Sequence, residues 1–214
     1  VIGSGVMGSG IACHFANVGI EVLLLDIAPN KLNENEEKLG LSINDKKVKN
    51  RIVTEMFQRC IKSKPAPLYH KSFTKRIVVG NLTDDISKIS EVDWIIEVVT
   101  EKLNIKQIVF TQIEKFRKKG TLITSNTSGI PIKQMNKGRS EDFRNHFAVT
   151  HFFNPPRYLK LFEIIPGPDC NPEIIDFLND FGERFLGKSS VLAKDTPGFI
   201  GNRIGIFGMV NILN

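Results

Sequence analysis

The sequence predicts an α/β protein built on a doubly wound, mostly parallel β-sheet. Short apolar runs of strand length alternate with segments of helical periodicity along most of the 214 residues, the pattern that crossover helices between parallel strands produce. A glycine-rich turn also joins the first apolar run to a helical pattern. The hydrophobic content of 41% and the charged content of 24% are ordinary for a globular domain with its own core.

The first half of the chain predicts strands separated by helices. Residues 1–5 end a strand, residues 6–19 form a helix closed by Gly19, and residues 21–26 form the next strand. Charged residues with helical spacing from about 31 to 63 predict two helices or one bent helix. Strands follow at 76–81, 93–99 and 121–126, with a helix at 101–120.

The second half predicts an antiparallel strand pair and then a change of domain. Apolar runs at 148–154 and 159–165 are separated by a proline-rich turn that is too short for a crossover helix. A helix at 172–187 and a strand at 189–195 follow. A strongly apolar helix then begins near Pro197, so we expect residues 1–195 to form the sheet domain and residues 196–214 to begin a second, helical domain. Both ends interrupt an apolar pattern, and we therefore expect a fragment of a longer polypeptide.

Composition disfavours several classes of protein. No apolar run approaches the roughly 20 residues of a membrane span, and the first residues do not form a signal peptide. Cys13, Cys60 and Cys170 are widely spaced and odd in number. They predict neither a disulfide framework nor a metal site, and a reducing cytoplasmic location is expected.

The net charge of +6 is concentrated in one segment. Between Lys46 and Arg76 ten basic residues are opposed only by Glu55, so this basic segment carries +9 and the remainder carries −3. A local positive field favours a polyanionic ligand, although a solvated helical face is the plainer reading. Nucleic acid is a weaker candidate, because the segment has few aromatic residues and no nucleic-acid-binding motif accompanies it.

The glycine-rich turn predicts a dinucleotide site of the Rossmann type. Gly3, Gly5 and Gly8 form GxGxxG between a strand and a helix, where the helix N-terminus offers free N–H groups to a pyrophosphate. Asp26 closes the next strand 18 residues after Gly8. A carboxylate there accepts the ribose hydroxyls and repels a 2′-phosphate, so NAD is favoured over NADP. The predicted cofactor loop is Gly3, Ser4, Gly5, Val6, Met7 and Gly8.

Polar residues also gather where strands should reach the carboxyl edge of the sheet, at which open α/β folds bind ligands. They are SNTSG at 125–129, His151 with Asn154, Glu163, and KDTPGFIGNR at 194–203. With the glycine loop, these stretches resemble the L-3-hydroxyacyl-CoA dehydrogenase family, including the dehydrogenase part of multifunctional fatty-acid oxidation proteins. The resemblance spans nearly the whole chain in the expected order. The matching stretches are GSGVMGSGIA, WIIEVVTEKLNIKQ, SNTSG, HFFNPPRYLKLFEII and KDTPGFIGNRI.

The resemblance implies an NAD-dependent oxidation of L-3-hydroxyacyl-CoA to 3-oxoacyl-CoA in β-oxidation. His151 is implied as the general base for the 3-hydroxyl, and Glu163 as the group that orients the imidazole and stabilises the imidazolium. Ser128 and Asn202 match positions that hydrogen-bond the reacting oxygens of the substrate. The residues implied at the nicotinamide half of the NAD site are Glu101, Lys106, Ser128 and Asn154. Each could instead be an ordinary structural residue, as a strand-end histidine or a turn asparagine often is.

The resemblance also assigns a role to the basic segment. In the family an equivalent helical hairpin lies beside the adenine and phosphates of coenzyme A, but the longer stretch from 61 to 78 prevents a residue-by-residue alignment. Family members complete the cleft with an all-helical domain that carries most dimer contacts. We therefore expect a homodimer in the intact protein and poor turnover by this fragment. Two alternatives remain open: a non-catalytic NAD-binding or structural protein, and a dehydrogenase of a small hydroxy acid.

Overall fold

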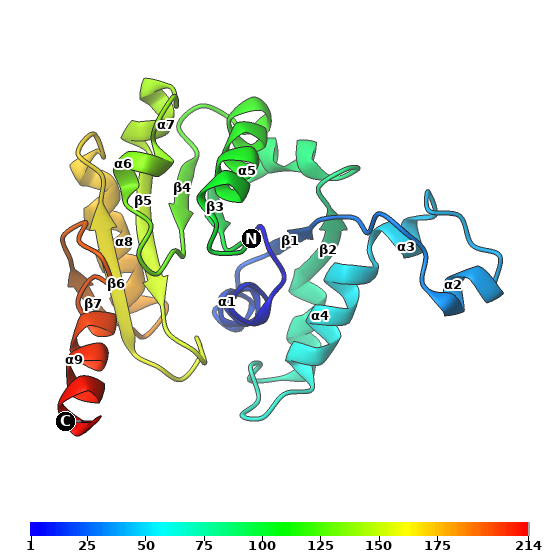
Figure 1. Cartoon of the computed structure of the whole chain (residues 1–214), viewed down its shortest axis with the longest axis horizontal. Helices are drawn as coiled ribbons and strands as arrows, with labels where there is room; N and C mark the ends of the chain where they lie inside the picture. Colours follow the sequence, from blue (N-terminus) through cyan, green and yellow to red (C-terminus); the bar gives the residue numbers. More distant parts are fainter. Residues whose placement is uncertain (214) are drawn as a thin grey trace.

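The computed structural model describes residues 1–213, and it shows the predicted sheet with helices on both faces (Figure 1). Five strands run in the order β3 (Trp94–Glu97), β4 (Leu122–Ser125), β5 (Phe147–Phe152), β6 (Leu161–Pro166) and β7 (Ser189–Leu192). A second pair is formed by β1 (Val22–Asp26) and β2 (Ile77–Asn81). Ile2 makes parallel bridges to Leu25 and Glu97 and so joins the two sets.

β6 and β7 run opposite to β3, β4 and β5, because β6 pairs antiparallel with β5 and β7 pairs parallel with β6. The doubly wound, mostly parallel α/β prediction is therefore confirmed. The register of the β5–β6 pair places His151 directly opposite Glu163. This pairing follows from the short proline-rich connection between the two strands, since loop length sets the register of such a pair.

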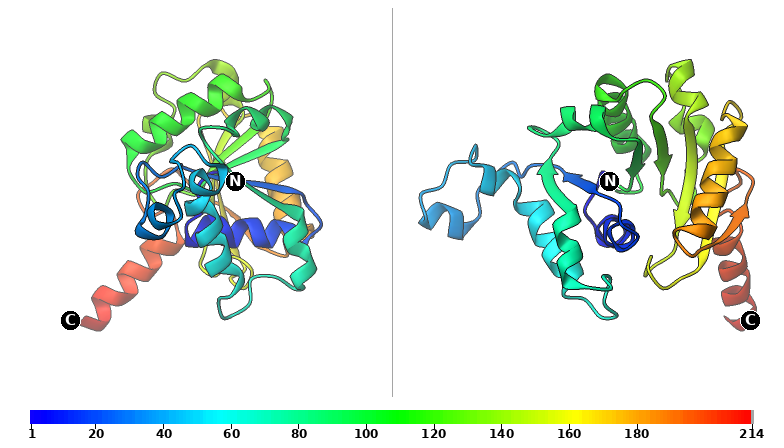
Figure 2. Two further views of the ribbon diagram at one scale, coloured as in Figure 1. Left: turned by 90° about the vertical axis from the view of Figure 1, so that its right-hand side faces the viewer. Right: turned by 180° about the vertical axis from the view of Figure 1, so that it is seen from behind.

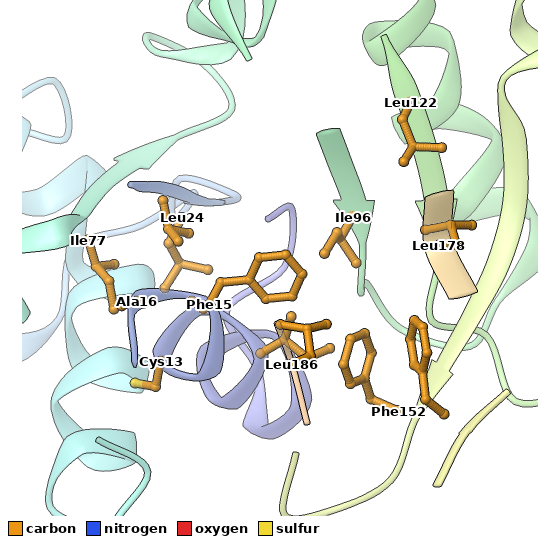
Figure 3. Close-up of a cluster of buried hydrophobic side chains, with 14 of the residues drawn as sticks. Cys13, Phe15, Ala16, Leu24, Ile77, Ile96, Leu122, Phe152, Leu178 and Leu186 are labelled. Atoms are coloured by element: carbon orange, nitrogen blue, oxygen red, sulfur yellow. The ribbon is translucent and has the colours of Figure 1, made fainter. Parts of the chain in front are cut away.

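Two hydrophobic cores lie on opposite faces of the sheet. The long helices α1 (Val6–Asn17), α4 (Arg51–Ile61) and α8 (Pro172–Arg184) share one core with residues such as Ile96, whereas α5 (Leu103–Phe116) shares the other with Ile95. Neighbouring strand residues point to opposite faces, so this division is the expected result of burying both. Figure 3 shows the first core, where Phe15 of α1 lies beside Ile96.

The shorter elements depart from the prediction in one region. Residues 31–63, predicted as two helices or one bent helix, instead form three: the short α2 (Glu34–Lys38), the short α3 (Lys46–Lys49) and the longer α4. Gly40 takes a φ of 64° directly after α2 and so ends it. Both short helices project from one end of the molecule (Figures 1 and 2). The other short elements are α6 (Ile132–Met135), α7 (Glu141–Asn145) and the 3₁₀ turns Lys71–Arg76 and Ile86–Glu91.

The last helix, α9 (Gly201–Leu213), begins four residues later than the sequence pattern suggested. Gly198 and Phe199 take positive φ values of 73° and 44°, and this left-handed backbone cannot continue into a helix. Figure 2 shows α9 extending away from the sheet. Its exposed side chains include Ile204, Ile206, Phe207, Met209 and Val210. None of the described helices combines the length and the apolar character needed to span a membrane.

Candidate functional site

The glycine loop is shaped by close backbone contacts at two glycines and by open space at the third. A Cβ on Gly3, whose φ is 102°, would lie 2.6 Å from the Val98 carbonyl oxygen, and a Cβ on Gly8 would lie 1.8 Å from that of Gly3. Gly5, the residue before α1, has nothing within 4 Å of its Cβ direction. No described side chain caps this helix N-terminus. The loop therefore leaves an open, electropositive helix end of the kind that holds a pyrophosphate.

Asp26 lies at the carboxyl end of β1 and faces the same loop. Its Oδ2 accepts hydrogen bonds from the backbone N–H of Ser4 at 2.6 Å and from the Ser4 hydroxyl at 2.5 Å, and its Oδ1 accepts one from Ile27 N–H at 2.7 Å. The carboxylate is thus held in place beside the glycine turn while remaining half-exposed. This is the position from which a carboxylate can receive ribose hydroxyls.

The exposed carboxylate of Glu101 meets the buried ammonium of Lys106 beside the SNTSG loop. Lys106 is 1% exposed, and its ammonium lies 2.8 Å from Glu97 Oε1 and 3.3 Å from Glu101 Oε2. Glu101 also accepts hydrogen bonds from the Thr127 hydroxyl and from Ser128 N–H. Burial by itself raises the pKa of Glu101, but the Thr127 hydroxyl and the Lys106 ammonium outweigh it and hold that pKa below its ordinary value. Lys106 therefore lies beneath Glu101 and keeps it ionised.

Sequence reasoning missed Glu97 as the centre of this network. Its carboxylate is fully buried at the end of β3 and also accepts from the Ser125 hydroxyl at 2.5 Å and from Val99 N–H at 2.7 Å. The available signal was a glutamate inside the apolar run WIIEVV, since a charge in a buried strand requires a partner. The partner, Lys106, comes nine residues later on α5.

His151 and Glu163 form a buried hydrogen-bonded pair across β5 and β6. The distance from His151 Nδ1 to Glu163 Oε2 is 2.7 Å, and the two residues are 5% and 0% exposed. A carboxylate only accepts, so Nδ1 carries the proton that it donates to Glu163. In the neutral imidazole Nε2 is then left with a lone pair. The rings of Phe153 and Phe199 lie 4.4 and 5.7 Å from the imidazole and confine it.

The second oxygen of Glu163 is held by the start of α9. Its Oε1 accepts hydrogen bonds from the backbone N–H groups of Ile200 at 2.9 Å and Gly201 at 2.7 Å. The left-handed Phe199 turns the chain so that these two amides face the carboxylate. The turn of the DTPGF motif therefore fixes the orientation of the carboxylate and satisfies its second oxygen.

The remaining predicted residues lie on the segments around this pair. Ser128 is exposed in the loop after β4, and Gly129 of this loop approaches the DTPG turn, since its Cβ would lie 3.4 Å from Gly198 N. Asn154 is exposed and follows Phe153, whose ring packs on His151. Asn202 is half-buried and follows Gly201, which holds Glu163. The structure thus brings the SNTSG, NPP and DTPGF segments to one side of the sheet.

The basic segment is partly neutralised within the chain. Lys49 pairs with Asp84 at 2.8 Å, Arg51 pairs with Glu36, and Arg76 donates to the carbonyl of Ala16 at 2.6 Å. A cavity of about 420 Å³ lies among α2, α3 and α4 and has Lys46 and Lys47 in its lining. Glu36 and Glu55 line the same cavity, and Lys46 and Lys47 are its two lysines that could meet an anionic ligand.

A larger cavity, of about 690 Å³, is not part of this site. Its lining includes Val22 and Trp94, which begin β1 and β3. The glycine loop and Asp26 lie at the opposite, carboxyl ends of these strands, which is the edge that binds ligands in open α/β sheets. The glycine loop with Asp26 and this cavity are thus at different edges of the sheet.

Together, the open glycine loop, the carboxylate ending β1 and the His–Glu pair define a Rossmann-type nucleotide-binding domain of the dehydrogenase class. Residues 1–196 match the family model described as 3-hydroxyacyl-CoA dehydrogenase, NAD binding domain. The chain therefore belongs to the 3-hydroxyacyl-CoA dehydrogenase family, and its cofactor is NAD.

Individual relatives agree with this assignment. The chain is 53% identical over 210 residues to a Bacillus subtilis protein named "Probable 3-hydroxyacyl-CoA dehydrogenase", covering 98% of this chain and 27% of that protein. It is 40% identical to a Rickettsia felis protein provisionally named a fatty acid oxidation complex trifunctional enzyme, and the match covers 97% of this chain and 27% of that protein. The structure of (S)-3-hydroxybutyryl-CoA dehydrogenase from Ralstonia eutropha superposes with a TM-score of 0.71 at 28% identity, and the match covers 98% of this chain and 67% of that one. The chain thus spans only about a quarter of the length of these two curated relatives.

Proposed function

We propose that this chain supplies the NAD site and the acid–base pair of an L-3-hydroxyacyl-CoA dehydrogenase that acts in fatty-acid β-oxidation. The observation that carries the proposal is the buried contact of 2.7 Å between His151 Nδ1 and Glu163 Oε2. Such a pair is the arrangement that a general base requires. The names of the Bacillus and Rickettsia relatives support the substrate class and the pathway.

The geometry explains how His151 would act as the base. Glu163 holds the proton on Nδ1, so Nε2 is free to take the proton of the substrate's 3-hydroxyl. NAD, when bound, would accept the hydride that leaves C3, the carbon that carries this hydroxyl. The imidazole becomes positively charged in this step, and the ionised Glu163 stabilises that charge. General-base assistance of this kind contributes about 10²- to 10⁴-fold in rate, or roughly 3–5 kcal/mol.

The residues present also fit the cofactor. The open space at Gly5 and the uncapped start of α1 would receive the pyrophosphate, and Asp26 would receive the adenosine ribose. Glu101, Ser128 and Asn154 would line the nicotinamide half, with Lys106 acting beneath Glu101.

The coenzyme A part of the substrate is assigned to the basic segment. Lys46 and Lys47 line the cavity beside α4, whereas Lys49 and Arg51 are already paired with acidic residues. The phosphates would therefore meet the first two lysines. Exposed apolar residues on α9 support packing against a helical domain in the intact protein, where a homodimer interface is also proposed. The free thiols of Cys13, Cys60 and Cys170 suit the proposed cytoplasmic location.

An absorbance assay for NADH with acetoacetyl-CoA tests this function in the full-length protein. His151→Gln should lower turnover by about a hundredfold or more while NAD affinity stays unchanged. His146→Gln is the matched control, because that histidine contacts the Asp142 carbonyl on α7 and lies outside the site. A wild-type protein that binds NAD without turnover would support the non-catalytic alternative. Full turnover by His151→Gln would remove that residue from the mechanism.

A second measurement separates an acyl-CoA substrate from a small hydroxy acid. High salt, or replacement of the substrate by its 3′-dephospho-CoA form, should raise KM because phosphate contacts are screened or lost. Lys46→Gln combined with Lys47→Gln should raise KM in the same way, with Lys160→Gln as an exposed control. An unchanged KM under all three perturbations would favour the small hydroxy acid.

A further inference from the structure

Lys188 is a buried ammonium that the proposed mechanism does not use. It is 6% exposed and precedes β7, and its Nζ donates hydrogen bonds to the carbonyl oxygens of Pro156 and, at 2.7 Å, of Leu159. The ring of Phe152 lies 5.9 Å from Nζ. In the part of the chain that the structure describes, no carboxylate lies within ion-pair distance of it. A buried charge without a counter-ion is costly, so the two carbonyls must be what holds it.

The charged and titratable groups that face Lys188 do not compensate for its burial. The titratable neighbour is His14 on α1, on which the charges of Lys188 and of Arg157, in the loop after β5, both act. Burial lowers the pKa of Lys188 to about 8. Burial, followed by the Lys188 charge, lowers the pKa of His14 to about 4, so the imidazole stays neutral near neutral pH. An apolar side chain of similar length would avoid this cost. The groups that the ammonium binds therefore account for a lysine at this position.

The ammonium binds the carbonyl end of a single helical turn. The backbone N–H groups of Tyr158 and Leu159 both donate to the Pro155 carbonyl, at 3.0 and 3.1 Å. The carbonyls at the other end of such a turn lack intrahelical partners, and a cation there is favourable. Lys188, which follows α8 in the chain, supplies that cation. Its backbone N–H donates to the carbonyl of Gly182 on α8 at 2.9 Å.

The same turn is held on its other sides by ring packing and by hydrogen bonds to backbone carbonyls. The Pro156 ring packs so closely on α1 that a Cβ on Gly10 would lie 3.0 Å from Pro156 Cδ. Arg157 Nη1 donates to the carbonyls of Ala66 at 2.6 Å and Leu68 at 3.1 Å. Lys188 thus ties the turn to the start of β7, in the second half of the sheet.

This turn forms the connection between the two members of the dyad. It begins after His151 on β5 and after Phe153 and Asn154, which follow that strand, and it leads into β6 and Glu163. We propose that Lys188 is a positioning residue, whose ammonium holds the turn 155–159 and thereby keeps Phe153 and Asn154 in place beside His151. The inference rests on the proposed dehydrogenase function. A displacement of about 1 Å at a reacting centre can cost on the order of a hundredfold in rate.

The experiment compares Lys188→Met, Lys188→Arg and the control Lys160→Met in the full-length protein. Lys160 is exposed at the end of the same loop, so its replacement removes a charge without touching the turn. We expect Lys188→Met to lower kcat by about tenfold or more, with KM for acetoacetyl-CoA changed by less than about twofold. We expect Lys188→Arg to recover most of kcat, and Lys160→Met to match the wild type.

Amide hydrogen exchange of the peptide covering 155–160 provides a readout that does not depend on turnover. Exchange should accelerate by about tenfold or more in Lys188→Met and stay at the wild-type rate in Lys160→Met. Wild-type kcat in Lys188→Met, or equal losses in the Met and Arg variants with unchanged exchange, would overturn the proposal. If Lys188→Met does not fold, Lys188→Gln takes its place. A wild-type enzyme without turnover would instead reject the dehydrogenase function, while exchange would still report on Lys188.

Discussion

Replacing Glu163 by Gln tests the dyad most directly, because the structure predicts which atom of the amide faces the histidine. Glu163 Oε1 accepts two backbone N–H groups, from Ile200 and Gly201. The amide oxygen of Gln must take this position, since an NH₂ group cannot accept. The NH₂ group then faces His151 and donates to Nδ1. The proton of the imidazole moves to Nε2, which can no longer act as a base.

The size of the effect follows from the charge that is lost. An imidazolium and a carboxylate with charge centres roughly 4 Å apart attract by about 4 kcal/mol at an effective dielectric constant near 20. At about 1.4 kcal/mol for each factor of ten, kcat should fall by about 10³-fold. The wrong tautomer acts in the same direction. The folded state should persist, because the amide occupies the same fully buried space as the carboxylate of Glu163.

Two measurements check this prediction. Steady-state kinetics gives the loss in kcat, and ¹⁵N NMR of the imidazole reports whether the proton resides on Nδ1 or Nε2. Glu114→Gln is a suitable control, because Glu114 also accepts a backbone N–H, from Ser140 at 2.7 Å, but lies on α5 away from the dyad. A kcat within about threefold of the wild type, or an unchanged tautomer in Glu163→Gln, would refute the reasoning.

Three further predictions concern the cofactor and stability. Asp26→Ser should narrow the preference for NAD over NADP by about tenfold in Kd measured by calorimetry, and an unmoved preference would contradict the ribose assignment. Burial lowers the pKa of His14 from 6.5 to about 4. The neutral histidine therefore contributes about 3 kcal/mol to the free energy of unfolding above pH 6.5, and this contribution is lost as the pH falls to 4. Urea unfolding should show this loss in the wild type and not in His14→Gln. Lys106→Met should destabilise the fold by about 3–5 kcal/mol, because it leaves Glu97 charged and buried; adding Glu97→Gln should recover part of that loss, and a neutral single variant would refute the pairing.

Local patterns in the sequence were enough for the fold and for half of the site. Alternating apolar and helical segments specified a mostly parallel sheet, because burial on two faces imposes those periods on any such chain. The glycine spacing indicated the loop, since a Cβ on Gly3 or Gly8 would clash with backbone. The short turn after His151 predicted an antiparallel pair, and Glu163 is indeed opposite His151 in its register.

Contacts between distant segments were decided by tertiary packing alone. Lys188 meets the turn of Pro156 from 32 residues away, and Ile200 binds Glu163 from 37 residues away. Neither contact produces a repeating pattern in the sequence, because each involves a single buried charged group. Periodicity records which side of an element is buried, whereas the partner of a buried ammonium or carboxylate depends on how whole elements pack against one another. The sequence by itself therefore determined the sheet, the cofactor loop and the opposing histidine and glutamate, and only the tertiary structure determined what holds that pair in position.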